Sequence, residues 1–327
     1  MRPFAYRRAR DDHDAVGLAS ARPGAAYIAG GTDLMQLWKT GTCAPDLVID
    51  ISRLALSAIE TRPDGVAIGA LARMSDVADH PAIRDGCPAV AQALLASASP
   101  QIRNVATVGG NLLQRTRCTY FRSNTLPCNK RHPGSGCGAI DGENRLHAIF
   151  GASAHCAATH ASDLAVALVA LDAVVRICGE GGVRALPVEE LFLLPGEHPE
   201  RETVLSPGEL IVEIAVPGGE LARCSTYVKV RDRASFEFAV VSVAVALQVE
   251  GGVIKHARIS AGGVGSKPWR LRNCEALLAG ARANEAAFRA AAGHAADGAA
   301  PLCGNGFKGE LLKRLVFRAL TDLRGEA

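Results

Sequence analysis

A chain of 327 residues with 36 Lys and Arg against 33 Asp and Glu carries a net charge of +3, which is too small to predict nucleic acid or a membrane surface as its main partner. Its hydrophobic content of 48% is that of a globular protein, and its length predicts two or three compact units. The longest apolar run, 164–177, is interrupted by Asp172 and is shorter than the roughly 20 residues of a membrane helix, so we expect no membrane insertion.

The first hundred residues predict short strands that alternate with helices, which is typical of a mixed α+β unit. Asp11 or Asp12 is positioned to cap the first helix, and Leu34 resumes helical spacing directly after Gly30-Gly31-Thr32-Asp33. Strands are expected at Arg2 to Arg8, Ala26 to Ala29, Asp46 to Ile51 and Gly65 to Gly69, and further helices around 74–80 and 89–98.

Hydrophobic periodicity then disappears from Arg115 to His155, where proline and glycine interrupt the chain repeatedly. Long loops without regular structure are uncommon inside compact domains and are usually functional or disordered. The apolar run 164–177 restores a regular element.

A change of composition at Pro217 to Glu220 predicts a domain boundary. Beyond it, strands are expected at 225–230, 239–249 and 253–261, and the Gly251-Gly252 pair predicts an antiparallel meander. The last helix places Leu312, Leu315 and Leu320 among the apolar residues of one face, which indicates that it packs on a core.

Two glycine loops, Gly30-Gly31-Thr32-Asp33 and 107–111, each lie between strand-like and helix-like residues. Because glycine lacks a side chain, such loops let the backbone approach a phosphate, and two of them suggest a diphosphate. Thr32 adds a hydroxyl and Asp33 a capping carboxylate, although a glycine turn that caps a helix also occurs without any ligand. Neither loop has the spacing G-x-G-x-x-G, which disfavours a Rossmann-type nucleotide fold.

Five short motifs, in this order, resemble the FAD-binding subunit of the xanthine dehydrogenase family of molybdenum hydroxylases. They are Ala29 to Leu34, Ile68 to Leu71, Ile102 to Asn104 leading into Thr107 to Asn111, Ser162 to Leu164, and Gly262 to Gly265. The resemblance implies a two-part FAD-binding domain of the vanillyl-alcohol oxidase (PCMH) type over residues 1–219, with an insertion at 115–156. It also implies an α/β domain like the C-terminal domain of carbon monoxide dehydrogenase flavoproteins over residues 220–327.

The resemblance also implies which residues bind FAD. Carried over by position, these are Ala26, Tyr27, Ile28, Ala29, Gly30, Gly31, Thr32, Asp33, Leu34, Thr107, Val108, Gly109, Gly110, Asn111, Asp163, Ile211 and Lys229. On a strand, Tyr227, Lys229 and Arg231 share one face, so Lys229 could direct its charge into an interdomain cleft; the alternative is a solvated edge-strand lysine. Asp163 could equally be a helix cap.

Cys118, Cys128, Cys137 and Cys156 lie in the insertion 115–156, whereas the other six cysteines are scattered and are expected to be buried. The four are too widely spaced for the close pairs of a zinc knuckle, so an iron–sulfur cluster is favoured over zinc. Neighbouring basic residues, among them Arg115, Arg117, Arg122, Lys130, Arg131 and Arg145, would favour a negative cluster, although an exposed basic loop is the alternative. We interpret His132, His147, His155 and His160 as loop residues.

The phrases around Cys118, Cys128 and Cys137 resemble the FAD subunit of bacterial periplasmic aldehyde oxidoreductases with three subunits. This resemblance implies a [4Fe–4S] cluster on the four cysteines. It also implies a complex with a large molybdenum-cofactor subunit and a small [2Fe–2S] subunit, in which the flavin delivers electrons to an external acceptor. No side chain can be named as catalytic from the sequence.

Two other functions remain open from the residues alone, a self-sufficient flavin oxidoreductase and a structural protein that binds zinc. Arg7 and Arg8 form a twin-arginine pair, but acidic residues follow where a signal peptide would be apolar, so we expect no targeting signal. The resemblance implies a periplasmic location through co-export with a partner that carries the signal; otherwise the complex would stay in the cytoplasm.

Overall fold

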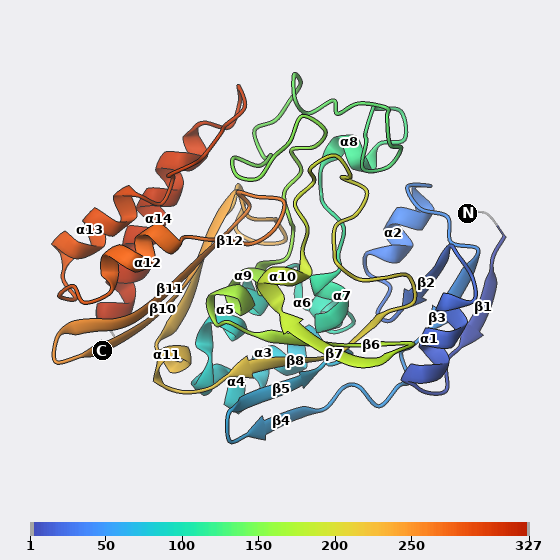
Figure 1. Ribbon diagram of the computed structural model, residues 1–327, viewed down its shortest axis with the longest axis horizontal. Helices are drawn as coiled ribbons and strands as arrows, with labels where there is room; N and C mark the ends of the chain where they lie inside the picture. The colour runs from blue at the N-terminus through green and yellow to red at the C-terminus, as the bar shows by residue number, and fades with distance from the viewer. Residues whose placement is uncertain (1–2, 326–327) are drawn as a thin grey trace.

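Three β-sheets and the helices that cover them give the chain the predicted α+β architecture. The computed structural model describes residues 3–325. Figure 1 shows the N-terminal unit at one end of the molecule and the C-terminal helices at the other, with a second sheet between them at the bottom of the view.

A small parallel sheet opens the chain. Its strands β1 (Ala5–Arg8), β2 (Ala25–Ile28) and β3 (Leu47–Asp50) lie in the order β1-β3-β2, and α1 (Asp12–Ser20) and α2 (Leu34–Lys39) connect them. Asp11 caps α1 by accepting a hydrogen bond from the Asp14 backbone N–H, which confirms one of the two predicted caps. Arg2, where the first strand was expected to begin, lies outside the described residues.

The second sheet has five strands with antiparallel pairing throughout, in the order β4-β5-β8-β6-β7. Its strands are β4 (Ile59–Arg62), β5 (Gly65–Gly69), β6 (Val174–Gly179), β7 (Gly182–Pro187) and β8 (Leu210–Pro217). The helices of this region are α3 (Met74–Asp79), α4 (Pro81–Gly86), α5 (Pro88–Ala96), α6 (Pro100–Arg103), α7 (Val108–Leu112), α9 (Asp163–Ala170) and α10 (Val188–Leu191).

The main core lies between this sheet and its helices. Ile68, Val175 and Ile214 from the strands pack in one cluster with Leu94 of α5 and Leu168 of α9, all essentially without exposure. The predicted apolar run 164–177 supplies both layers, because it divides into α9 and β6. The turn between them is at Asp172, which has a φ of +51° and is the residue that interrupts the run.

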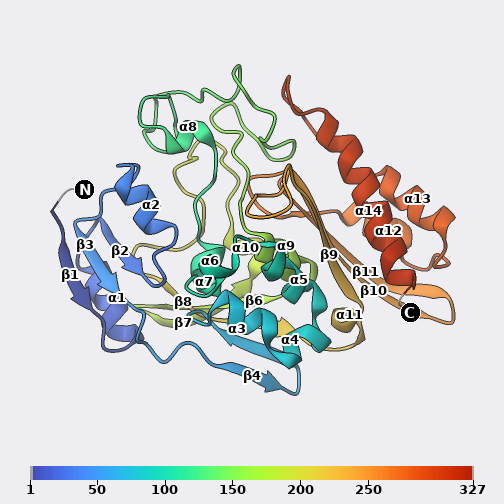
Figure 2. The ribbon, with the colours of Figure 1, turned by 180° about the vertical axis from the view of Figure 1, so that it is seen from behind.

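The predicted irregular segment between α7 and α9 contains α8 (Thr119–Arg122) and no other helix among the described residues. Side chains that bond to backbone carbonyls hold it together. Arg131 donates to Tyr120 O and Phe121 O at 2.8 and 2.7 Å, and Asn144 donates to Ala139 O at 3.1 Å. Figures 1 and 2 both show this segment at the top of the molecule, between α2 and the C-terminal helices.

The C-terminal part forms the predicted antiparallel meander after the short helix α11 (Glu220–Arg223). Its strands are β9 (Ser225–Val230), β10 (Val241–Glu250), β11 (Val253–Gly262) and β12 (Trp269–Arg270), in the order β12-β11-β10-β9. The turn residues Gly251 and Gly252 have φ of +56° and +76°, which favours glycine at both.

Side chains alternate between the two faces of this last sheet. Val243 and Val245 of β10 pack with α12 (Arg272–Leu278), α13 (Glu285–Gly293) and α14 (Phe307–Gly325), as predicted for the last helix. Ala244 and Ala246 belong to the core of α5 and α9 on the other face. The second face of the sheet is therefore an internal boundary between the two parts of the chain.

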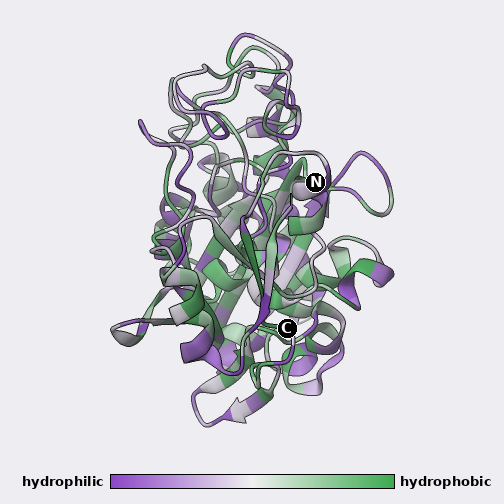
Figure 3. Cartoon of the chain, turned by 90° about the vertical axis from the view of Figure 1, so that its right-hand side faces the viewer, coloured by the Kyte–Doolittle hydropathy of each residue, from purple (hydrophilic) through white to green (hydrophobic). Residues whose placement is uncertain are grey.

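The hydropathy of the chain follows these layers. Figure 3 shows hydrophobic colour concentrated in the sheets and the helices that cover them, with hydrophilic colour in many of the loops. Within residues 3–325, no helix combines the length and the apolar character needed to cross a membrane.

Candidate functional site

A cavity of about 720 Å³ lies where the N-terminal unit, α6, α7 and the loop after β9 meet. This volume is in the range of cofactor and ligand pockets. All of the predicted FAD-binding residues line it except Val108 and Lys229; the lining ones are 26–34, Thr107, Gly109, Gly110, Asn111, Asp163 and Ile211. Val108 is instead fully buried in the core, and Lys229 lies behind Asp163.

The two glycine loops contact each other at Gly30. A Cβ atom added to Gly30 would lie 2.1 Å from the carbonyl oxygen of Val105, just before the second loop, so no larger residue fits. Gly31 has a φ of +69°, in the left-handed region. Gly30 is therefore needed for close packing and Gly31 for the turn, and together they make this wall of the cavity from backbone.

The second loop is itself the start of α7. The Thr107 hydroxyl accepts a hydrogen bond from the Gly110 backbone N–H and caps the helix. Gly109 faces the protein, because a Cβ there would meet Ala70 at 2.9 Å. Gly110 is exposed into the cavity, and a Cβ there would contact only the Thr107 hydroxyl, at 3.0 Å.

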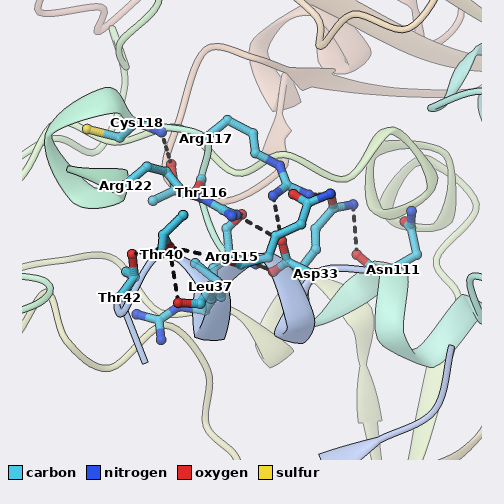
Figure 4. Close-up of polar contacts among 12 residues, drawn as sticks. Asp33, Leu37, Thr40, Thr42, Asn111, Arg115, Thr116, Arg117, Cys118 and Arg122 are labelled. Carbon is cyan, nitrogen blue, oxygen red and sulfur yellow. Dashed lines mark hydrogen bonds and ion pairs between the residues drawn. The ribbon is translucent and has the colours of Figure 1, made fainter. Parts of the chain in front are cut away.

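Asp33 is at the N-cap position of α2, but its carboxylate makes no capping hydrogen bond, so that predicted role is wrong. Instead the carboxylate accepts from Arg117 at 2.5 Å, from Arg122 at 2.9 Å and from the Arg115 backbone N–H at 2.9 Å (Figure 4). Burial acts to raise the pKa of Asp33, but the two guanidinium groups outweigh it and hold the pKa below its ordinary value. Asp33 thus joins the first glycine loop to the irregular segment.

The Asp163 carboxylate is held at the cavity wall by three buried side chains. Tyr227 donates at 2.5 Å, Lys229 at 2.8 Å and Ser97 at 2.8 Å. The Lys229 side chain is only 3% exposed although β9 is an edge strand, so the solvated alternative is wrong. Burial, followed by the Asp163 charge, raises the pKa of Tyr227 well above its ordinary value, so the phenol remains a proton donor.

The cap of α9 is Ser162 and not Asp163. The Ser162 hydroxyl accepts a hydrogen bond from the Ala165 backbone N–H at 3.0 Å. The alternative interpretation of Asp163 as a helix cap is therefore wrong. Its carboxylate instead faces Lys229 and the cavity.

One wall of the cavity could not be predicted from the sequence. The loop between β9 and β10 brings Phe236 and Phe238, which are 53% and 40% exposed, to the cavity. The irregular segment contacts this loop twice: the Arg117 guanidinium lies 4.9 Å from the Phe238 ring centre, and Arg145 pairs with Asp232 at 2.8 and 3.0 Å. In the sequence, this loop has no periodicity that would predict its position, and its one distinctive feature is two phenylalanines in a charged stretch.

The four predicted metal-binding cysteines all lie in the irregular segment between α7 and α9. Cys128 and Cys137 pair as an isolated antiparallel bridge. Burial raises the pKa of Cys118 to about 12, and nearby Cys156 and Cys128 add to the rise. Burial likewise raises the pKa of Cys156, with further contributions from Cys137 and Cys128. Each of the four thiols therefore lies within electrostatic range of another.

No group of three or more His, Cys, Asp and Glu side chains within residues 3–325 has the arrangement that would hold one metal ion. Of the six scattered cysteines, Cys87, Cys178 and Cys274 are buried as predicted. Cys43 and Cys224 are partly exposed and Cys303 is exposed, so the prediction of burial is wrong for these three, most clearly for Cys303.

The basic residues of the segment also differ from the expectation, because most of them have carboxylate partners. Arg115 and Lys130 pair with Glu202, Arg117 and Arg122 pair with Asp33, and Arg145 pairs with Asp232. Three carboxylates therefore compensate part of the charge of these five cations within the protein.

Comparison with known proteins gives matches over both parts of the chain. Residues 2–219 match the FAD binding domain in molybdopterin dehydrogenase, and residues 226–323 match the CO dehydrogenase flavoprotein C-terminal domain. The aldehyde oxidoreductase FAD-binding subunit PaoB of Escherichia coli K12 is 44% identical over 333 residues, which cover 100% of both chains. The glyceraldehyde dehydrogenase medium chain of Sulfolobus acidocaldarius is 27% identical, over 86% of this chain and 83% of that one.

Solved structures show the same fold. Carbon monoxide dehydrogenase from Hydrogenophaga pseudoflava superposes with a TM-score of 0.77 at 25% identity, covering 99% of each chain. Carbon monoxide dehydrogenase from Oligotropha carboxidovorans superposes with a TM-score of 0.78 at 21% identity, over 100% of this chain and 99% of that one, and shows the fold alone. The predicted fold class is thereby confirmed, and the chain belongs to the FAD-binding medium subunits of the molybdenum hydroxylase family of oxidoreductases.

Proposed function

We propose that this chain is the FAD- and [4Fe–4S]-containing electron-transfer subunit of a molybdenum-dependent aldehyde oxidoreductase. The observation that carries the flavin part is the cavity of about 720 Å³, in which both glycine loops, Asp163 and Ile211 meet. The aldehyde part is supported by 44% identity, over the whole of both chains, to a subunit named for aldehyde oxidoreduction.

The walls of the cavity suit a long ligand with a diphosphate and an aromatic ring. Backbone groups of 29–33 and 109–111 would hold the diphosphate, and the rings of Phe236 and Phe238 offer aromatic surface. FAD, when bound, supplies the electron-transfer chemistry. Lys229 and Tyr227 fix the Asp163 carboxylate at the wall, so that it can accept a hydrogen bond from the ligand in a defined position.

The cluster part of the proposal rests on Cys118, Cys128, Cys137 and Cys156. Thiolates are the ligands that iron–sulfur clusters prefer, and a cluster spans a wider space than one ion. The segment that carries them has little regular structure, while ordering its backbone costs roughly 1–2 kcal/mol per residue. A metal centre would offset part of that cost, because its binding energy is also folding energy.

The partners in this proposal are a large molybdenum-cofactor subunit, a small [2Fe–2S] subunit and an external electron acceptor. The likeness to medium chains supports an assembly of this kind. Oxidation of the aldehyde would then occur in the large subunit, and this chain would receive the electrons. The proposed compartment is the periplasm, reached by co-export with a signal-bearing partner.

An anaerobic comparison of the isolated chain with the reconstituted complex tests this function. Both should contain flavin, and a chemical reductant should bleach the flavin absorbance in both. An aldehyde should bleach it only in the complex, because the substrate site belongs to another subunit. Bleaching of the isolated chain by aldehyde would instead identify a self-sufficient flavin oxidoreductase, and absence of flavin from both preparations would refute the cofactor.

A further inference from the structure

Lys308, in the first turn of α14, has no exposed surface. Its ammonium group donates to two backbone carbonyls, His147 O at 2.9 Å and Gly263 O at 2.7 Å, and no ion pair within residues 3–325 includes it. Burial and then the neighbouring Arg145 lower the pKa of Lys308 to about 7. A buried cation without a carboxylate partner is costly unless another negative group compensates it.

Lys308, Asn305 and Gly304, at or just before the start of α14, form hydrogen bonds to the irregular segment, and we call this set of contacts the latch. Asn305 donates to His147 O at 3.1 Å and to Ala148 O at 3.2 Å, and the Gly304 backbone N–H donates to the Asn144 side chain at 2.8 Å. Figures 1 and 2 show the start of α14 beside this segment. The latch therefore fixes the backbone on both sides of His147.

The side chain of His147 points from this fixed backbone to one of the four thiols. Its Nε2 lies 3.2 Å from Cys118 Sγ, and His147 is 6% exposed. Its other ring nitrogen, Nδ1, is buried and has no hydrogen-bond partner in residues 3–325. The Cys118 sulfur is thus the partner of the imidazole, and an Nε2–H group would donate to it.

We propose that His147 and Lys308 are positioning residues that tune the four-cysteine centre, His147 by a hydrogen bond to Cys118 and Lys308 by a buried positive charge on the His147 backbone carbonyl. The inference rests on the proposed [4Fe–4S] cluster. Hydrogen bonds to cluster sulfurs and nearby positive charge both stabilise the reduced, more negative state, so they raise the reduction potential. The same negative centre would compensate Lys308, which has no carboxylate partner among the described residues.

Redox titration of the cluster, followed by electron paramagnetic resonance of the purified protein, tests the inference. His147→Leu and Lys308→Met should each lower the midpoint potential. At a fixed potential, the ratio of oxidised to reduced cluster should rise about tenfold, which corresponds to about 59 mV for one electron. His147→Gln, which keeps an N–H donor, should restore most of the potential. Lys313→Met on the same helix and His256→Leu on β11 are the matched controls and should change nothing.

Iron and FAD contents, measured on the same samples, separate the possible failures. Variants that keep wild-type iron and FAD but also keep the wild-type potential would overturn the tuning roles. A lower potential that His147→Gln fails to restore would show that the hydrogen bond to Cys118 does not matter. Wild-type protein that contains zinc, or no metal, would overturn the cluster proposal itself and the tuning roles with it. If Lys308→Met does not fold, the pair His147→Leu and His147→Gln still decides the matter.

Discussion

Asp33 joins the cofactor cavity to the irregular segment through a single carboxylate. It lies at the cavity wall and binds Arg117, Arg122 and the backbone of Arg115. Since Arg117 precedes Cys118 directly and also lies over Phe238, these contacts connect the first glycine loop, the cysteines and the loop between β9 and β10. Occupancy of the cavity and order in the segment should therefore depend on each other.

Replacing Asp33 with Asn should lower the free energy of unfolding by about 1–3 kcal/mol at neutral pH, because it removes hydrogen bonds between charged groups. The matched control is Asp76→Asn, at an exposed site in α3 where the carboxylate has no ion pair among the described residues. Urea unfolding of both variants and the wild type measures the difference. An Asp33→Asn protein as stable as the Asp76→Asn protein would contradict the structural role of the bridge.

The interaction of Asp33 with its two arginine partners also predicts that the free energy of unfolding depends on pH. The folded-state pKa of Asp33 is lowered, so its stabilisation is fully present above the unfolded pKa of about 3.9 and is lost as the pH falls through the lower folded value. The deficit of Asp33→Asn should thus be the same at pH 7 and pH 5 and should shrink below about pH 4. A deficit that shrinks between pH 7 and pH 5 would assign the linkage to another group.

For individual residues, the sequence predicted their location in the cavity better than it predicted their interaction partners. Nearly all the residues carried over for FAD line the cavity, since a resemblance preserves position. The partners of Asp33, Asp163 and Lys229 are more than 60 positions away along the chain, so no local pattern could reveal them. His147 was interpreted as a loop residue for the same reason, because only the tertiary fold brings it to Cys118.

Helix α7 presents Gly110 to the cavity, and this arrangement gives a prediction at the scale of elements. A valine side chain at Gly110 would extend from the open face of the helix into the proposed diphosphate site. We expect Gly110→Val to weaken FAD binding at least about tenfold, or ~1.4 kcal/mol. Fluorescence titration of the apoprotein with FAD measures it.

Gly17 supplies the control for this prediction. It is also an exposed helical glycine without positive φ, and a Cβ there would meet nothing within 4 Å. Gly17→Val should therefore carry the same cost of β-branching in a helix without changing FAD affinity. Equal FAD affinity in the two variants would remove α7 from the binding site.

Many of the regular elements followed from periodicity, because most strands and helices in this chain have a buried face, but the strands β4, β7 and β8 of the second sheet were not predicted. The meander of β9, β10 and β11 and the helix α14 match their predictions to within a few residues. The short helices α8, α10 and α11, of four residues each, were not predicted, because four residues contain too little periodicity. The division of the run 164–177 into helix and strand depended on the turn at Asp172, which periodicity alone cannot locate.

In the molecule as a whole, the proposed FAD site and the proposed cluster site lie in the same chain and are connected by direct contacts. The cavity lies between the N-terminal unit and the β9–β10 loop, and the cysteine segment contacts both through Asp33, Arg145 and Phe238. The resemblance predicted two cofactors, but the contacts between their sites, and the latch of α14 on His147, became visible only in the folded chain.

Cofactor analysis of the wild type and of Cys128→Ser and Cys224→Ser variants, all purified anaerobically, tests most directly the claim that one chain carries both centres. Cys128 is one of the four proposed ligand residues, whereas Cys224 lies at the end of α11, outside that group. The wild type and Cys224→Ser should contain FAD with about four iron and four sulfide per chain, as a [4Fe–4S] centre requires. Cys128→Ser should lose the iron and sulfide. Zinc in place of iron, or unchanged iron in Cys128→Ser, would contradict the account.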